Sequence, residues 1–232
     1  MYTITDAHPI TIFALSSLMM FVSFFIVSMY ASAGFLRKGI IISSIITVWG
    51  GFMFWFCLSN YVSKIEPPFG SLITPLSWII PSLIIYIKRD WFLEASISQK
   101  WLTGIQIFRI EGGVFLIEMI GGNVPAIFAY PAGIGDVIVG CSALVGLIYF
   151  RNRNNLPNQF VIFIIVIGIV DLISAFFFGF TSSSTSPLQL FFPPEKSTLI
   201  LFPTGMIPLF FVPIAIAFHT LSWLNFRKYD SK

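Results

Sequence analysis

Residues 106–136 read QIFRIEGGVFLIEMIGGNVPAIFAYPAGIGD, and they place ionisable side chains within segments that are otherwise apolar enough for a lipid bilayer. An ionisable side chain at the bilayer centre costs about 2.5–3.5 kcal/mol on insertion scales, so such residues usually face a protein interior and pair with one another. The stretch therefore predicts membrane helices with a polar interior. The residues singled out in this stretch are Gln106, Arg109, Glu111, Glu118 and Asp136.

The composition of the whole chain supports a membrane protein. Of 232 residues, 56% are hydrophobic and 10% are charged, whereas a soluble domain carries about 25% charged residues. Spans of about 20 residues fill a chain of this length, so we expect one helical membrane domain over residues 1–232. The net charge of +3 does not call for a nucleic-acid partner, because the basic residues lie in short loops between apolar runs. Cys57 and Cys141 fall within apolar runs and indicate neither a disulfide nor a metal site.

Hydropathy and helix breakers predict an all-α bundle of seven transmembrane helices. The third helix contains Pro75 and Pro81 and should be kinked. Pro131 is placed to open the fifth helix, whose many small residues favour a central position. The seventh should be distorted by its three prolines. The expected helices cover approximately 10–32, 39–62, 71–87, 100–120, 132–150, 159–181 and 198–224.

The basic residues predict the orientation of this bundle. With seven helices, ten basic residues fall on one side and only Lys64 and Lys196 on the other. Cytoplasmic loops carry the excess of Lys and Arg, so the N-terminus is expected outside and the C-terminus in the cytoplasm. The ten are Arg37, Lys38, Lys88, Arg89, Lys100, Arg151, Arg153, Arg227, Lys228 and Lys232.

The polar residues of the fourth to seventh helices predict two clusters. On an α-helix, Gln106, Arg109 and Gly113 share one face, while Glu111 and Glu118 share another. Counting depth at about 1.5 Å per residue predicts an inner polar cluster and an outer acidic pair. The inner cluster is Gln106, Arg109, Asp171 and His219, with Glu111 as a further intramembrane polar residue, and the outer pair is Glu118 and Asp136.

A purely structural role is a full alternative for these residues. Buried ion pairs and proline-kinked helices also occur in bundles that only need to hold together. Asp136, near the expected start of the fifth helix, could be placed there by the helix dipole. His219, near the end of the seventh, could cap the last carbonyl groups.

Three functions remain open from the residues themselves. Ionisable groups at several depths, together with a broken seventh helix, suit a path for protons or a small solute. The sequence Gly133-Ile134-Gly135-Asp136 reads GxGD and resembles the aspartyl intramembrane proteases, such as presenilin and the prepilin peptidases, which would make Asp136 and Asp171 the catalytic pair. In those families, however, the second aspartate precedes the motif. A rhomboid-like pair of Ser142 and His219 is a third possibility.

Two cofactors are unsupported by the sequence. Seven helices with this orientation resemble microbial rhodopsins, but the seventh contains no lysine to form a retinal Schiff base. A haem with two histidine ligands would need two intramembrane histidines, and only His219 qualifies because His8 precedes the first helix. We therefore expect no cofactor.

The C-terminal half resembles a family of uncharacterised bacterial multi-pass membrane proteins. The resemblance implies a bacterial cytoplasmic membrane and no particular substrate. We expect a non-enzymatic protein, in contact with the bilayer, that binds or moves a small solute or protons through the fourth to seventh helices; an intramembrane protease and a structural or accessory subunit are the alternatives. The resemblance rests on Gln106-x-x-Arg109, Gly113, Phe115-Leu116, Gly122, Pro125, Pro131-Ala132-Gly133-x-Gly135-Asp136, Gly140, Pro208, Pro213 and His219.

Overall fold

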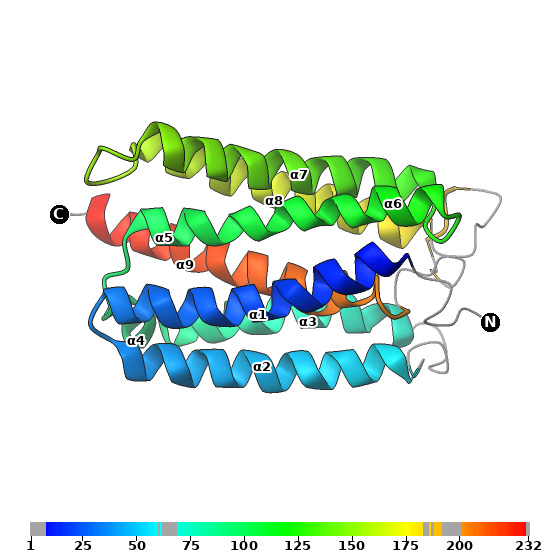
Figure 1. Cartoon of the computed structure of the whole chain (residues 1–232), viewed down its shortest axis with the longest axis horizontal. Coiled ribbons are helices and arrows are strands. Elements are labelled where there is room, and N and C mark those ends of the chain that lie inside the picture. The colour runs from blue at the N-terminus through cyan, green and yellow to red at the C-terminus, as the bar shows by residue number, and fades with distance from the viewer. Residues whose placement is uncertain are drawn as a thin grey trace.

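The computed structural model describes residues 8–59, 61, 69–182, 186, 188–191 and 201–230, and in this part of the chain every regular element is a helix. The long helices run side by side along the longest axis of the molecule, with the start of the first helix and the end of the last helix at opposite ends (Figure 1). The elements are α1 (Pro9–Ser32), α2 (Leu36–Leu58), α3 (Phe69–Ile87), α4 (Arg89–Leu93), α5 (Gln99–Gly104), η3 (Ile105–Gly113), α6 (Val114–Ile120), α7 (Ala126–Tyr149), α8 (Asn158–Thr181), η4 (Ile207–Phe211) and α9 (Val212–Asp230).

Within the part of the chain that the structure describes, five helices are long and apolar enough to cross a membrane, which indicates a membrane protein. They are α1, α2, α7, α8 and the segment Ile207–Lys228, which joins η4 to α9. The two other expected spans are also helical. One is α3, with a shorter apolar run over Leu72–Ile87, and the other is the continuous series α5, η3 and α6 from Gln99 to Ile120.

The expected start of the fifth helix is wrong. The helix α7 begins at Ala126, six residues before the predicted start, and Pro131 lies inside it. Pro125 is extended, with φ −63° and ψ 135°, and precedes the first helical residue. A proline inside a membrane helix is tolerated when neighbouring groups satisfy the carbonyl that it leaves free. This shift moves every later residue of α7 about 9 Å deeper along the bundle.

The seventh predicted helix is distorted, as its prolines indicate. Residues 202–205 form turns, η4 is a wide helix of the π type that contains Pro208, and regular α-helix begins at Val212. The predicted start at residue 198 lies outside the described residues. The helix continues to Asp230 rather than ending at residue 224.

The η4–α9 segment, and not α7, is the central helix. Of its most apolar window, 72% is buried inside the protein, against 39% for α7. The small residues of α7 have another use, because they allow close approach: a Cβ at Gly140 would lie 2.7 Å from the Ile110 backbone nitrogen of η3. The outward side chains of α7 and α8, such as Ile138, Val170 and Ile173, are exposed and apolar.

Polar side chains fix α9 to the start of α5. Asn225 donates a hydrogen bond to the Ile97 carbonyl at 2.9 Å. The Gln99 amide donates to the Ser222 carbonyl at 2.9 Å, and the Ser222 hydroxyl donates back to Gln99 at 2.8 Å. These contacts hold the η3 segment next to α9, which places Arg109 within reach of His219.

Candidate functional site

Arg109 lies in the middle of the α5–η3–α6 series, where the helix is of the tighter 3₁₀ type over Ile105–Gly113. Such a helix has three residues per turn, so side chains three apart are eclipsed. Gln106, Arg109 and Gly112 therefore form one row, and all three are buried. The prediction that Gly113 shares this face is wrong, because it assumed the α-helical repeat.

The guanidinium of Arg109 binds groups from three other helices. Its Nε donates to Asp136 Oδ1 of α7 at 2.7 Å, and its Nη2 donates to Asp171 Oδ2 of α8. Its Nη1 donates to the Gly168 carbonyl at 3.3 Å and lies 3.4 Å from His219 Nε2 of α9. Arg109 is 2% exposed. We call Arg109, Asp136, Asp171 and His219 the charge cluster, and it joins η3, α7, α8 and α9.

The protonation of His219 follows from the donor set of its neighbour. A guanidinium has five N–H donors and no acceptor. His219 Nε2 must therefore be the acceptor in its contact with Arg109 Nη1. The imidazole in this arrangement is neutral, with its proton on Nδ1.

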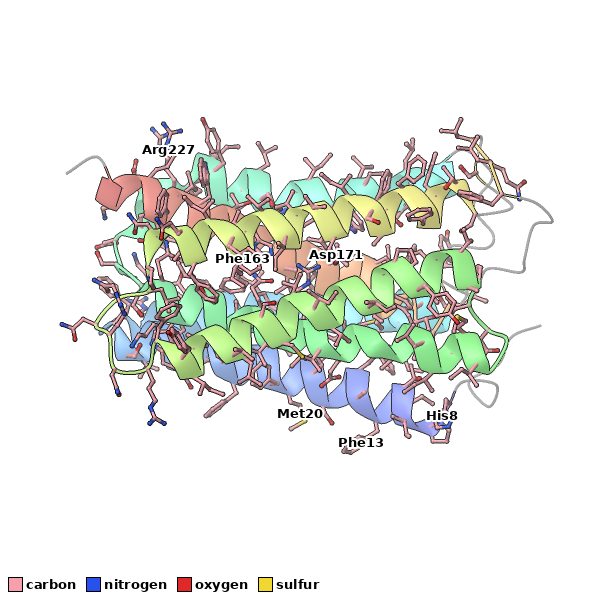
Figure 2. The ribbon with its side chains drawn as sticks, turned by 90° about the horizontal axis from the view of Figure 1, so that it is seen from above. His8, Phe13, Met20, Phe163, Asp171 and Arg227 are labelled. Atoms are coloured by element: carbon pink, nitrogen blue, oxygen red, sulfur yellow. The ribbon has the colours of Figure 1, made fainter. Side chains whose placement is uncertain are left out.

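The two aspartates lie at the same depth in the bundle. Asp136 is ten residues after the start of α7, and Asp171 is ten residues before the end of α8, at the same end of the molecule (Figure 1). Each is thus about 15 Å from that end. Asp171 lies near the middle of the length of the bundle (Figure 2). The expected position of Asp136 near the outer face is wrong because α7 begins six residues earlier than predicted.

The expected outer pair of Glu118 and Asp136 does not form. Asp136 is too deep and binds Arg109. Glu118 is fully buried and binds the start of α1: its Oε1 accepts from the His8 backbone N–H at 3.0 Å and from the Thr11 hydroxyl. Its Oε2 accepts from the Asn123 amide at 2.6 Å. A carboxylate at a helix N-terminus is stabilised by the helix dipole, so Glu118 is a cap for α1.

Three glycines make room for the side chains of the charge cluster. A Cβ at Gly112 would overlap the Asp136 side chain, and a Cβ at Gly135 would overlap the Asp171 carboxylate. A Cβ at Gly168 would overlap the His219 ring and lie 2.9 Å from Arg109 Nη1. We call these three residues the glycine seats. Of the three, only Gly135, within the GxGD pattern, carried a signal in the sequence; nothing local distinguished the other two.

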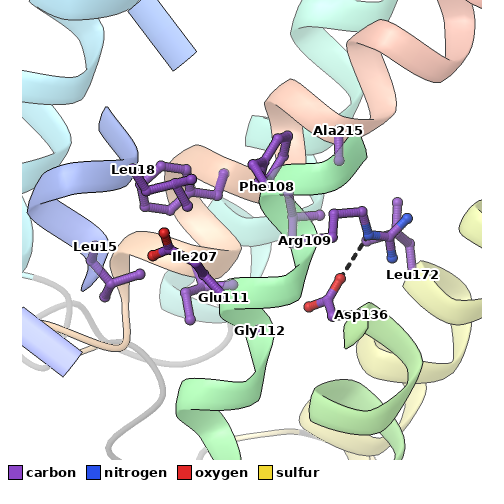
Figure 3. Close-up of a pocket in the computed structure, with 12 residues that line it drawn as sticks. Leu15, Leu18, Phe108, Arg109, Glu111, Gly112, Asp136, Leu172, Ile207 and Ala215 are labelled. Carbon is purple, nitrogen blue, oxygen red and sulfur yellow. Dashed lines mark hydrogen bonds and ion pairs between the residues drawn. The ribbon is translucent and has the colours of Figure 1, made fainter. Parts of the chain in front are cut away.

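A small cavity adjoins the charge cluster on the side of α1 and η4. Its volume is about 20 Å³, which is enough for one water molecule. Glu111 points into this space beside Leu15 and Ile207, on the other side of η3 from the Arg109–Asp136 pair (Figure 3). Glu111 Oε2 is buried and has no hydrogen-bond partner among the described residues.

Gln106 lies one 3₁₀ turn before Arg109 but binds a different group. Its amide nitrogen lies 3.5 Å from the Ala215 carbonyl of α9, at the limit of a hydrogen bond. Its Oε1 is buried and has no partner in the described part of the structure. Gln106 thus contacts the central helix and does not bind the aspartates of the charge cluster directly.

Comparison with known proteins identifies one family. A family model described as a domain of unknown function (DUF8737) matches residues 72–226. No curated protein and no solved structure matches the chain. The matched residues run from α3 to α9 and include the whole charge cluster and all three glycine seats.

Proposed function

Because the chain belongs to the DUF8737 family of domains of unknown function, the family supplies no activity, and we propose from the site itself that this membrane protein binds and transfers protons. The observation that carries the proposal is the binding of one guanidinium to two buried carboxylates at mid-depth in the bundle. In membrane segments, ionisable residues of this kind typically belong to ion or proton paths.

The charge balance of the cluster supports a bound proton. Arg109 contributes one positive charge, Asp136 and Asp171 contribute two negative charges when both are ionised, and His219 is neutral. The excess negative charge is unfavourable in a medium of low dielectric constant. One added proton makes the cluster neutral, and its carboxylates and imidazole offer alternative places for that proton.

The small volume of the cavity beside Glu111 favours protons over larger solutes as the species that is transferred. Sites for small organic molecules usually measure about 300–1,000 Å³, whereas this cavity measures about 20 Å³. Glu111 and Asp136 both line it. Glu111 Oε2 has no hydrogen-bond partner among the described residues, so a water in this cavity would bind it, and a proton needs only a chain of such hydrogen bonds to pass around η3 to the charge cluster.

The proposal includes seven membrane spans with the C-terminus in the cytoplasm of a bacterium. The α1–α2, α3–α5 and α7–α8 connections lie at the end of the bundle where α9 ends (Figure 1). Lys100 Nζ donates to the Arg151 carbonyl at 3.1 Å, which joins two of these basic connections. An excess of basic residues at one end favours that end as the cytoplasmic one.

The geometry favours proton transfer over proteolysis. A GxGD protease needs Asp136 and Asp171 to activate a water between them by acid/base chemistry. Here the Arg109 guanidinium binds both carboxylates and offers each a positive partner. A serine protease pair is not supported either, because His219 Nε2 contacts Arg109 rather than Ser142.

Proton flux into vesicles tests the proposal. The full chain is reconstituted into lipid vesicles that contain a pH-sensitive dye, and a potassium gradient with valinomycin makes the interior negative. We expect the wild type to acidify the interior. We expect Asp171→Asn and Glu111→Gln to reduce the flux to that of protein-free vesicles, and Asp90→Asn, an exposed residue of α4, to leave it unchanged.

The alternatives give different results in the same preparation. A folded wild type with no flux would contradict the proposal and favour an accessory role. Cleavage of a transmembrane test peptide that is lost in both Asp136→Asn and Asp171→Asn, without proton flux, would show a protease.

A further inference from the structure

A second and larger cavity lies between α1, α2 and the residues around η4. Its volume is about 380 Å³, within the range of about 300–1,000 Å³ that holds small molecules. Leu15 lines both this cavity and the one beside Glu111, so it separates the two. The other lining residues are Ile12, Ser16, Met19, Met20, Ser23, Thr47, Phe54, Phe202, Met206 and Phe210.

The walls of this cavity suit hydrocarbon. No charged side chain is among its lining residues. The Ser16 hydroxyl donates to the Ile12 carbonyl at 2.8 Å, and the hydroxyls of Ser23 and Thr47 lie 3.1 Å apart in a mutual hydrogen bond. The hydroxyls therefore have partners within the protein. Flexible methionine side chains adapt to an apolar ligand of variable shape.

The surroundings of the cavity identify the source of the hydrocarbon. Met20 of α1 is 76% exposed and Val48 of α2 is 74% exposed, so the helices that flank the opening present apolar side chains outward. In a bilayer, such faces contact lipid chains. Met206 and Phe210, in contrast, are each 1% exposed and form the inner wall.

We propose that this cavity binds one acyl chain of a bilayer phospholipid, with the headgroup outside the cavity. The apolar walls exclude an ion, and the position between two lipid-facing helices allows entry from the bilayer. The site is independent of proton transfer, because it lies on the other side of Leu15 from Glu111.

Photocrosslinking tests this proposal. The full chain is reconstituted in phosphatidylcholine vesicles that contain a trace of phosphatidylcholine with a diazirine near the middle of one acyl chain, irradiated, and analysed by peptide mass spectrometry. Lipid at the outer surface should label exposed residues that do not line the cavity, such as Val48. An acyl chain in the cavity should also label Met206 and Phe210, which lipid at the outer surface does not reach. Labelling of the exposed residues without Met206 and Phe210 would overturn the proposal.

A matched pair of variants tests whether the label enters through this cavity. Thr47→Phe places a ring in the cavity and should abolish labelling of Met206 and Phe210, whereas Val48→Phe, one residue away on the lipid-facing side, should preserve it. Ser16→Phe is a second filling variant, should Thr47→Phe not fold. Labelling that persists in a folded filling variant contradicts the site, and labelling by a diazirine fatty acid alone contradicts a phospholipid as the occupant.

Discussion

Each acidic or imidazole side chain that contacts Arg109 packs against a glycine of a neighbouring helical segment. Asp136 of α7 lies against Gly112 of η3, Asp171 of α8 against Gly135 of α7, and His219 of α9 against Gly168 of α8. The absent Cβ atoms let three polar side chains converge on one guanidinium without separating the helices. At the scale of single residues, glycine is therefore as necessary to the charge cluster as the charges are.

Alanine at Gly112 should damage the protein, whereas alanine at the next position should not. The Cβ of Gly112→Ala overlaps Asp136, and overpacking of this kind costs about 1–3 kcal/mol. In Gly113→Ala the nearest atom is Val137 Cγ2 at 3.4 Å, an ordinary contact, so the free energy of unfolding should stay within about 1 kcal/mol of the wild type. Unfolding in mixed detergent micelles measures the free energy of unfolding of both variants. Equal effects of the two substitutions would contradict the seat at Gly112.

At the scale of elements, the sequence predicts the existence of the helices better than their internal geometry. Apolar runs and breakers located every long helix, because the bilayer dictates both length and composition. Pro131 predicts a helix start, since proline favours the first turn, but α7 includes it. No local pattern distinguishes the 3₁₀ geometry of η3 from an α-helix, so the face that contains Gly112 could not be predicted.

The difficulty of predicting helix boundaries also explains which contacts of the candidate site could not be predicted from the sequence. Arg109, Asp171 and His219 could be grouped from their depth along the predicted helices. The place of Asp136 depended on a helix start that was six residues in error, and the partner of Glu118 depended on the fold of α1 over α6. Local errors in the helix boundaries thus became errors in the pairing of carboxylates.

The attachment of α9 to the segment before α5 should depend on Asn225. Its amide donates to the Ile97 carbonyl and is 2% exposed, so Asn225→Ala leaves a buried carbonyl without that donor and should lower the free energy of unfolding by about 1–3 kcal/mol. Thr220→Val is the control, because the Thr220 hydroxyl donates to the Ile216 carbonyl of its own helix and, among the described residues, to no other helix. Denaturant titration measures the free energy of unfolding of both variants. A larger loss of this free energy in Thr220→Val than in Asn225→Ala would contradict the role of Asn225 in attaching α9.

At the scale of the whole molecule, the seven membrane spans that we propose predict which loops face the outside. A membrane-impermeant maleimide added to intact cells should label Gly121→Cys, in the α6–α7 connection, and should not label Asn154→Cys, in the α7–α8 connection, until the membrane is opened. The wild type is the control, since Cys57 and Cys141 lie within α2 and α7. Labelling of Asn154→Cys in intact cells would reverse the proposed orientation.

The arrangement around Arg109 also sets an order for biosynthesis. The chain leaves the ribosome from its N-terminus, and Arg109 precedes its partners Asp136, Asp171 and His219 by 27, 62 and 110 residues. At about 5–20 residues per second, Asp136 is synthesised seconds after Arg109, and Asp171 and His219 follow later. We therefore expect the nascent α5–η3–α6 series to stay close to the insertion machinery or to water until α7 and α8 have been made. A chain that stops before residue 136 lacks both Asp136 and Asp171, the acidic partners that these helices supply to Arg109.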